Sequence, residues 1–337
     1  MKAVGYFKSL PVSDPESLID ITAETPTPTG RDLRVAVKAV SVNPVDTKVR
    51  MRAAPAAGEP AKILGYDAAG VVEAVGPDVT LFKVGDEVFY AGSIVRQGTN
   101  SEFHLVDERI VGKKPKSLSF TQAAALPLTS ITAWELLFDR FAIKPGDGEG
   151  RALLIFGGAG GVGSIMIQLA RQLTKLTVIA TASRPETQAW CRKLGAHHII
   201  DHTKPLAEQL KAIGHPTVAL IASLTGTAQH FAAVPDIIEP FGKFGLIDDP
   251  PVLDAMTLKR KAVSLHWELM FTRPVFQTPD MIGQHQLLDE VSAMIDKGQI
   301  VTTAAQELTP INAANLRKAH AQIESGTTIG KVVLHGW

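Results

Sequence analysis

Five glycines occupy seven consecutive positions in the stretch GGAGGVG, residues 157–163, between the apolar runs ALLIF and SIMIQLARQL. Gly158, Gly160 and Gly163 match the pattern G-x-G-x-x-G, placed after an expected strand and at the start of an expected helix. In this pattern the first glycine makes a tight turn, the second leaves room for a pyrophosphate, and the third lets the helix approach the strand. Backbone N–H groups and the helix dipole then face the anion. The segment therefore predicts a dinucleotide site rather than a turn without a ligand, built from Gly158, Ala159, Gly160, Gly161, Val162 and Gly163.

The end of the next expected strand decides between the two nicotinamide cofactors. An NAD site carries an acidic residue there, about 20 residues past the glycines, to accept the ribose hydroxyls. Here the sequence is VIATASRPE, with Ala182 at the expected position and Ser183 and Arg184 after it. A hydroxyl and a guanidinium can bind a 2′-phosphate, and no carboxylate is present to repel one. The segment favours NADPH, although Ser183-x-x-Glu186 with Pro185 also has the form of a helix-capping box.

Alternating strands and helices must position these residues. From Arg151 onward, the short apolar runs ALLIF, TVIAT, HHIID and TVALIAS are expected strands. The amphipathic segments 161–173, 185–194 and 204–213 between them are expected helices. This βαβ texture predicts a doubly wound parallel sheet with both faces covered.

The first part of the chain has a different pattern. LRVAVKAVSV (33–42) alternates apolar with polar or small residues, and GVVEAVG and VGDEVFYAG are short β-branched runs closed by glycine. These segments predict a compact, barrel-like β domain. From Thr121, TQAAALPLTSITAWELLF has a helical pattern that Pro127 divides into two pieces.

Composition limits the classes of function. The chain has 337 residues, 45% of them hydrophobic, which is more than one domain usually holds. Lys plus Arg and Asp plus Glu balance at 34 each, so no basic field is available for nucleic acid or an anionic membrane. The single cysteine, Cys191, excludes an internal disulfide and a thiolate zinc cluster. The start, MKAVGYFKSL, is too short an apolar run for a signal peptide, and no segment approaches a membrane span, so we expect a cytoplasmic protein.

Longer motifs connect these features to a known family. GYDAAGVVEAVGPDVTLFKVGDEVF (65–89), GGAGGVG and the terminal GKVVL (330–334) resemble the medium-chain dehydrogenase/reductase superfamily along nearly the whole chain. SVNPVDTKVR, GTNSEFHLVDERIVGKKP and LPLTSITAWELLFDR are similar to its quinone oxidoreductases, in particular the branch labelled zinc-type alcohol dehydrogenase-like. The resemblance implies an α/β protein with a GroES-like β-barrel catalytic domain, residues 1–124 and 266–337, and an inserted Rossmann cofactor domain, residues 125–265. The active site would lie in the cleft between the domains.

The zinc in that label conflicts with the residues. Family alcohol dehydrogenases hold a catalytic zinc with two cysteines and a histidine, and the matching positions here are Asn43, Ala125 and Tyr66. The four cysteines of a structural zinc lobe are also missing. The histidines at 197, 198 and 202 flank an expected strand, which suits a surface role or a place near the cofactor phosphate better than a metal site. We therefore expect no metal.

Without zinc, the chemistry that the resemblance favours is reduction of a conjugated acceptor. Alcohol oxidation needs a Lewis acid or base to stabilise an alkoxide. A quinone or activated enone instead receives hydride from NADPH and takes up the charge on its own carbonyl, so the protein mainly orients two rings and excludes water. By resemblance, the residues beside the cofactor besides the glycines, Ser183 and Arg184 are Asn43, Pro44, Thr129, His202, Leu246, Ile247 and Lys331.

Three residues are candidates for catalysis by the same resemblance: Tyr66, Asp46 and Asn43. The Tyr66 hydroxyl could donate a hydrogen bond to the developing oxyanion, and Asp46 could order that network. Alternatively, Tyr66 is only a wall of the cleft, and Asp46 is a turn or ion-pair residue.

Three functions remain open from the sequence. The first is an NADPH-dependent quinone or enone reductase; the second is an alcohol dehydrogenase without zinc; the third is a non-enzymatic NADPH-binding protein, since a fold alone does not establish chemistry. We also expect a homodimer, because FGKFGLI (241–247) and AVSLHWEL (262–269) would lie near an edge of the parallel sheet, and an unpaired edge is commonly covered by a partner.

Overall fold

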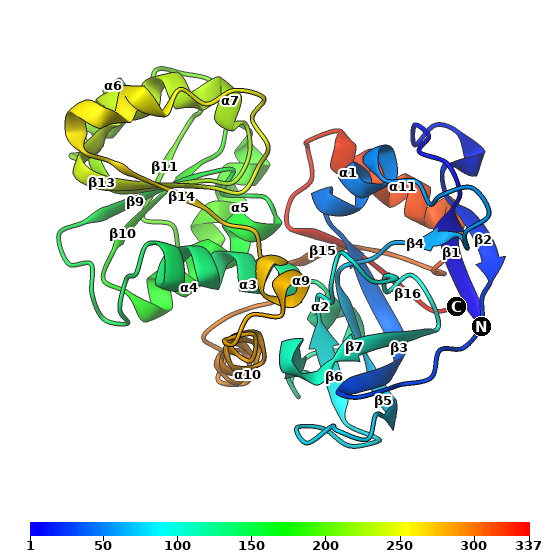
Figure 1. Cartoon of the computed structure of the whole chain (residues 1–337). Coiled ribbons are helices and arrows are strands. Elements are labelled where there is room, and N and C mark those ends of the chain that lie inside the picture. The colour runs from blue at the N-terminus through cyan, green and yellow to red at the C-terminus, as the bar shows by residue number, and fades with distance from the viewer. The chain divides into compact units, whose positions relative to one another are not determined.

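The computed structural model describes all 337 residues and divides into two compact units (Figure 1). The discontinuous unit comprises residues 1–131 and 271–337, and the inserted unit comprises residues 132–270. The expected two-domain α/β architecture is confirmed. No helix has both the length and the apolar character needed to cross a bilayer.

A six-stranded sheet forms the centre of the inserted unit, and every neighbouring pair in it is parallel. The strand order is β11-β10-β9-β12-β13-β14, so the sheet grows outward in both directions from β9 and β12. The strands are β9 (Ala152–Phe156), β10 (Thr177–Thr181), β11 (His198–Ile200), β12 (Val218–Ser223), β13 (Ile238–Leu246) and β14 (Ser264–Trp267). Because all six run the same way, their carboxyl ends share one edge of the sheet.

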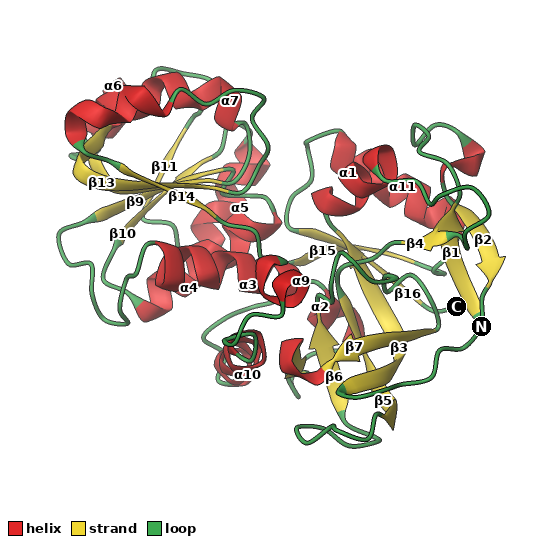
Figure 2. Cartoon of the chain, in the orientation of Figure 1, coloured by secondary structure: helices red, strands yellow, loops and turns green.

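Helices cover both faces of this sheet, with α4 and α5 on one side and α6 and α7 on the other (Figure 2). The helices are α4 (Gly161–Leu173), α5 (Pro185–Lys193), α6 (Leu206–Ala212), α7 (Thr227–His230) and α8 (Val234–Ile237). The expected helix 161–173 is confirmed. The expected helix 204–213 is shorter, because Pro205 is its N-cap and Lys204 remains in the preceding loop, 3.5 Å from Asp201.

A π-helix, which the sequence pattern did not predict, continues α3 (Pro127–Trp134) over Glu135–Arg140. The Phe141 N–H donates to the Leu136 carbonyl at 2.9 Å, five residues earlier. This segment packs directly on β13 at Gly245, where an added Cβ would lie 2.5 Å from Leu136 Cδ1 and 2.8 Å from the Phe141 ring. Apolar periodicity cannot separate a π-turn from an α-turn, and π-helices are frequent at functional sites.

The discontinuous unit is built on a seven-stranded sheet of order β15-β16-β3-β5-β6-β8, with β7 paired to β3, and a three-stranded sheet of order β2-β1-β4. Its strands are β1 (Lys2–Tyr6), β2 (Ile19–Thr22), β3 (Asp32–Val42), β4 (Lys62–Ile63), β5 (Ala68–Val75), β6 (Glu87–Tyr90), β7 (Phe103–Asp107), β8 (Val111–Lys113), β15 (Ala304–Leu308) and β16 (Lys331–His335). Its helices are α1 (Pro44–Arg52), α2 (Phe120–Ala124), α9 (Thr272–Phe276), α10 (Gly283–Asp296) and α11 (Ala313–Glu324). The last strand, β16, pairs antiparallel with β3, so Val332 lies opposite Val42. This pairing places the C-terminal strand β16 beside the end of β3, so Lys331 lies close to Asn43.

Candidate active site

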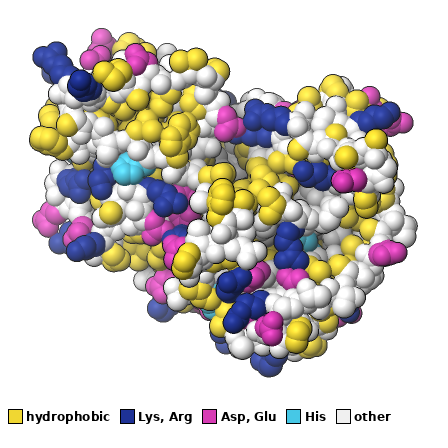
Figure 3. All heavy atoms as spheres, viewed as in Figure 1, with side chains coloured by type: hydrophobic (Ala, Val, Ile, Leu, Met, Phe, Trp, Pro, Cys, Tyr) yellow, Lys and Arg dark blue, Asp and Glu magenta, His cyan; other side chains and the backbone are white.

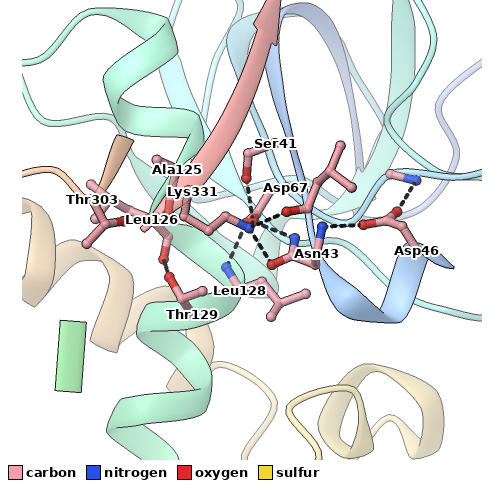
Figure 4. A network of polar contacts seen from close by, with 12 residues as sticks. Ser41, Asn43, Asp46, Asp67, Ala125, Leu126, Leu128, Thr129, Thr303 and Lys331 are labelled. Carbon is pink, nitrogen blue, oxygen red and sulfur yellow. Dashed lines mark hydrogen bonds and ion pairs between the residues drawn. The ribbon is translucent and has the colours of Figure 1, made fainter. Parts of the chain in front are cut away.

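A buried carboxylate, Asp67, is the centre of a polar network in the discontinuous unit (Figure 4). It lies between Tyr66 and the first residue of β5. Burial raises the pKa of Asp67 above its usual value, although the Lys331 charge and the hydrogen bonds from Asn43 and Leu128 act in the opposite direction. The donors are Ser41 Oγ at 2.9 Å, Asn43 Nδ2 at 2.7 Å and Lys331 Nζ at 3.0 Å to Oδ2, and the Leu128 N–H at 2.7 Å to Oδ1. Four donors on one carboxyl group favour its ionised form.

The ammonium of Lys331 is held entirely inside the protein. Lys331 is buried, and its Nζ donates to the Val42 carbonyl at 2.9 Å, to Asp67 Oδ2 and to Asn43 Oδ1. Three acceptors use all three N–H donors of an ammonium group. Asn43 therefore bridges cation and anion through its two amide atoms, which fixes the orientation of its side chain.

Asp46 connects the start of α1 to the loop that carries Tyr66 and Asp67. Its Oδ2 accepts from the Asn43 N–H at 2.8 Å, as the third residue of a helix commonly does, and its Oδ1 accepts from the Gly65 N–H at 3.0 Å. Burial raises the pKa of Asp46 to about 7. Gly65 has φ +113° and no room for a Cβ, which would lie 2.4 Å from Thr99 Oγ1. The loop geometry thus depends on this glycine and on the Asp46 carboxyl group.

Tyr66 is buried with a hydroxyl that has no hydrogen-bond partner in the protein. Its ring meets the Phe271 ring edge-on, with the centroids 5.3 Å apart. Burial raises the pKa of the phenol, which keeps the proton on the oxygen at neutral pH. A buried polar atom without a partner costs about 1–3 kcal/mol, and a catalytic role or an ordered water is a common reason for such an atom in a native structure.

The two remaining expected residues of this unit lie beside the network. Thr129 is buried, and its hydroxyl donates at 3.0 Å to the carbonyl of Leu126, the residue before α3. Pro44 is exposed at the first position of α1.

In the inserted unit, the glycine segment follows β9, and each glycine has a different reason to lack a side chain. The positive φ of +79° lies at Gly157, one residue before the G-x-G-x-x-G match, and Gly158 follows it in the same turn. A Cβ at Gly158 would lie 2.7 Å from the Ala180 Cβ, and one at Gly163 would lie 2.3 Å from the Gly157 carbonyl oxygen. A Cβ at Gly160 would have only an ordinary 3.5 Å contact. The backbone beside Gly160 is therefore open, and Gly158 and Gly163 serve the packing of α4 on the sheet.

The N-terminus of α4 suits an anion. The helix begins at Gly161, and its N-cap, Gly160, has no side chain to accept hydrogen bonds from the first turn. The first N–H groups of a helix lack acceptors within the helix, and the helix dipole favours negative charge there. Ala159, Gly161 and Val162 complete this turn as the sequence predicted.

At the end of β10 the structure places Ala182, Ser183 and Arg184 before α5. The capping box expected at Ser183 is wrong, because the N-cap is Arg184 and its N–H donates to the Thr187 hydroxyl at 3.2 Å. The Arg184 guanidinium lies 3.3 Å from the Glu186 carboxylate in an exposed ion pair, a type of contact that contributes little to stability. Ser183 is therefore not the N-cap of α5.

The three clustered histidines do not converge. His202, after β11, meets the His230 ring edge-on at 5.6 Å, and His230 stacks on Phe156 at 4.9 Å. Burial lowers the pKa of His230, which favours the neutral ring. His197 instead contacts Arg171 and the Val178 N–H, and His198 faces His215.

Leu246 is the last residue of β13, and its carbonyl accepts from the Glu268 N–H at 3.1 Å. The Ile247 N–H donates to the Ser223 carbonyl at 3.3 Å. Gly158, Ser183, His202 and Leu246 thus follow or end four parallel strands at the carboxyl edge of one sheet. Dinucleotides bind at this edge in doubly wound folds.

Comparisons with known proteins agree with this geometry. Residues 29–116 match the family described as alcohol dehydrogenase GroES-like domain, and residues 194–334 match the family described as zinc-binding dehydrogenase. A zinc-type alcohol dehydrogenase-like protein of Staphylococcus aureus (strain MSSA476) is 41% identical over 341 residues, covering 99% of this chain and 100% of the relative. The chain belongs to the medium-chain dehydrogenase/reductase superfamily.

Solved structures of this superfamily have the same fold along the whole chain. A Rhizobium etli CFN 42 protein, described as a candidate zinc-dependent alcohol dehydrogenase, is 61% identical with a TM-score of 0.96 and covers 100% of this chain and 98% of its own. A quinone oxidoreductase of Pseudomonas syringae pv. Tomato DC3000 is 30% identical with a TM-score of 0.82 and 99% of both chains covered. A mycobacterial protein solved with NADPH is 26% identical with a TM-score of 0.84, covering 99% of this chain and 100% of its own. The chain is therefore an oxidoreductase by family.

The residues of this superfamily member do not fit a zinc ion. At the three matching positions, Ala125 offers no side-chain ligand, Asn43 is occupied by Asp67 and Lys331, and Tyr66 keeps its proton. No cluster of three or more His, Cys, Asp or Glu side chains in the chain could hold a metal. We derive no catalytic step through zinc.

Asp67 and Ser41 are members of this polar network that sequence reasoning missed. An acid in the otherwise apolar and glycine-rich GYDAAG, directly before a buried strand, was the available signal. Ser41 carries no such signal, because only the pairing of β3 with β5 brings it to Asp67.

Proposed function

We propose that this chain reduces quinones or activated enones with NADPH and without zinc. The observation that carries the proposal is the buried Tyr66 hydroxyl, which lacks a partner and stands where metal-bearing relatives place a zinc ligand. A neutral phenol at this position can donate to an acceptor oxygen but supplies no Lewis acid for an alkoxide. The likeness to a quinone oxidoreductase supports the same acceptor class.

NADPH is the proposed cofactor. The residues proposed to hold its phosphates are the Gly158–Gly163 segment at the N-terminus of α4, with Ser183 and Arg184 for the 2′-phosphate and His202 nearby. The open side of Gly160 and the lack of a carboxylate at Ala182 support this assignment. The mycobacterial relative that was solved with NADPH also supports it.

When bound, NADPH supplies the hydride that the acceptor's conjugated carbon receives. The chain's own residues orient the acceptor and stabilise charge on its oxygen. Tyr66 donates its hydroxyl proton as a hydrogen bond to that oxygen, and a proton from solvent completes the hydroquinone or the saturated ketone. Asp67 and Lys331 hold Asn43, and Asp46 holds the loop with Tyr66, so this surface is rigid before the acceptor arrives.

The remaining expected residues have positioning roles in this proposal. Asn43, Pro44 and Thr129 line the nicotinamide side, and Leu246 and Ile247 contact the ring through their backbone. Lys331 acts through Asn43, because its three donors are already used inside the protein. Catalysis would then rest on Tyr66, with Asn43 and Asp46 supporting it.

A homodimer is part of the proposal. The edge strand β14 is unpaired on one side within the chain. Side chains around it are unusually exposed for apolar residues: Trp267 is 56% exposed, Leu269 57% and Phe241 81%. Figure 3 shows hydrophobic side chains gathered on the visible face of the inserted unit. An exposed apolar edge is commonly covered by a second copy, and a monomeric mass at micromolar concentration would argue against it.

Steady-state assays separate the three functions that the sequence left open. NADPH oxidation with a panel of ortho-quinones and enones tests the proposed reductase, and alcohols with NADP⁺ test an alcohol dehydrogenase. Tight NADPH binding without turnover of either panel would instead indicate a non-enzymatic binding protein. The free, buried Cys191 is compatible with a reducing compartment, and we propose that the protein works in the cytoplasm.

A further inference from the structure

Two buried glutamates of the inserted unit lie against a single arginine. Glu268 follows β14 and is 3% exposed, and Glu135, the first residue of the π-helix, is fully buried. Arg140, the last residue of that π-helix, has Nε 2.9 Å from Glu268 Oε2 and Nη2 3.8 Å from Glu135 Oε2. Nothing in the proposed reaction uses these three side chains.

One cation cannot neutralise two buried carboxylates. Two ionised glutamates beside Arg140 would leave a net negative charge in the interior, which is costly unless a proton is taken up. Apart from the Arg140 contact, neither carboxyl oxygen of Glu268 has a protein donor within hydrogen-bonding geometry, and one contact is few for a buried anion. Burial and the neighbouring Glu135 raise the pKa of Glu268 well above its usual range, although Arg140 acts in the opposite direction.

The pair lies at the carboxyl end of β13. The Glu268 N–H donates to the Leu246 carbonyl at 3.1 Å, so the position of Glu268 sets the end of this strand. The π-helix that carries Glu135 and Arg140 packs on the preceding residue, Gly245, with no space between them. One cluster thus ties β13, β14 and the π-helix together.

We propose that Glu268 and Glu135 share one proton and, with Arg140, hold the carboxyl end of β13 in place, so that Glu268 is a positioning residue for the Leu246–Ile247 backbone. This inference rests on the proposed function, in which that backbone contacts the nicotinamide. Paired carboxyl groups that share a proton are a known solution for two acids in one site.

The inference gives NADPH affinity a dependence on alkaline pH. The shared proton is bound in the folded state at neutral pH, and its loss at alkaline pH places a second negative charge beside Arg140. The other titratable groups on the packed elements are Asp139 on the π-helix, Lys243 on β13 with Arg151 beside it, Glu239 at the opposite end of β13, and His266 on β14. Burial lowers the pKa of His266, which stays neutral in this range, and burial lowers the pKa of Lys243, which therefore needs its own control.

The test compares Glu268→Gln, Glu268→Ala and Lys243→Met with the unmodified chain. NADPH dissociation constants are measured by fluorescence titration from pH 7 to pH 10, together with KM and kcat. For the unmodified chain and for Lys243→Met, we expect NADPH binding to weaken about tenfold across this range, equivalent to 1.4 kcal/mol. Glu268→Gln keeps a neutral, hydrogen-bonding side chain. The NADPH affinity of this variant should therefore equal that of the unmodified chain at pH 7 and should not change up to pH 10. Glu268→Ala should bind weakly at every pH.

A second readout needs no cofactor. Hydrogen–deuterium exchange of the peptide spanning 264–271 should accelerate at pH 10 relative to the same peptide in Glu268→Gln at that pH. An alkaline loss of NADPH affinity that persists in Glu268→Gln would overturn the inference, as would equal exchange in the two proteins. If the unmodified chain binds no NADPH at any pH, the proposed function fails, and the exchange comparison still decides whether the shared proton holds this edge.

Discussion

Replacing Tyr66 by phenylalanine keeps the ring and its edge contact with Phe271 and removes only the hydroxyl. That hydroxyl has no hydrogen-bond partner within the chain, so its removal breaks no hydrogen bond of the protein and should leave the free energy of unfolding nearly unchanged. If the hydroxyl binds the acceptor oxygen in the transition state, kcat should fall about tenfold or more for a simple enone, corresponding to at least about 1.4 kcal/mol. NADPH binding should not change.

The choice of acceptor sharpens this test. The enolate formed from an enone is more basic than the anion formed from an ortho-quinone, so the enone should lose more rate. Chemical denaturation gives the stability, and deuterated NADPH shows whether the hydride step limits kcat. Tyr90→Phe is the matched control: Tyr90 is equally buried, but its hydroxyl is 3.2 Å from His104 Nδ1, so this variant should lose stability and keep kcat. An unchanged kcat for both acceptors in Tyr66→Phe, with the hydride step rate-limiting, would reduce Tyr66 to a wall of the site.

Three further predictions follow from the same sites. Arg184→Ala should weaken NADPH by about 1.5–3 kcal/mol and leave NADH nearly unchanged, and equal losses in titrations with both would show that Arg184 does not contact the 2′-phosphate. Prolonged chelation should change neither activity nor melting temperature, whereas stoichiometric zinc in elemental analysis would contradict the zinc-free proposal. Burial raises the pKa of Asp46 from 3.8 to about 7, so the stability that its proton provides is complete below pH 4 and is lost as the pH rises through 7. Between pH 5 and pH 8 the free energy of unfolding should fall by about 1.4 kcal/mol or more relative to Asp46→Asn, and parallel profiles in denaturation would refute this.

The parallel sheet and its ligand edge were predictable because their signals are local. The apolar runs ended at the residues where β9 and β10 end, and the glycines marked the start of α4. The structural reason for each glycine was not predictable, because it depends on neighbours distant in the sequence. The positive φ falls at Gly157, and the need for glycine at Gly158 comes from Ala180 on the next strand.

The polar network was only partly predictable. The family resemblance placed Asn43 and Lys331 beside the cofactor and Asp46 beside Tyr66. Asp67 joins them only because β3 pairs with both β5 and β16. The Glu135–Glu268 pair likewise forms only because the π-helix packs beside β13 and β14, and periodicity contains no sign of that helix. The sequence shows the residue types, but it does not show which distant segments pair or pack together, and this limits the prediction of such networks.

The central claim is hydride transfer from NADPH to a conjugated acceptor by a metal-free protein. The most direct measurement uses protein shown by elemental analysis to be free of zinc, NADPH deuterated at C4 and an enone, with mass spectrometry of the product. We expect deuterium on the carbon β to the carbonyl, in one-to-one ratio with NADPH consumed, and no reduction of NADP⁺ by alcohols. Absence of label from every acceptor, together with alcohol oxidation that appears only when zinc is added, would contradict the account.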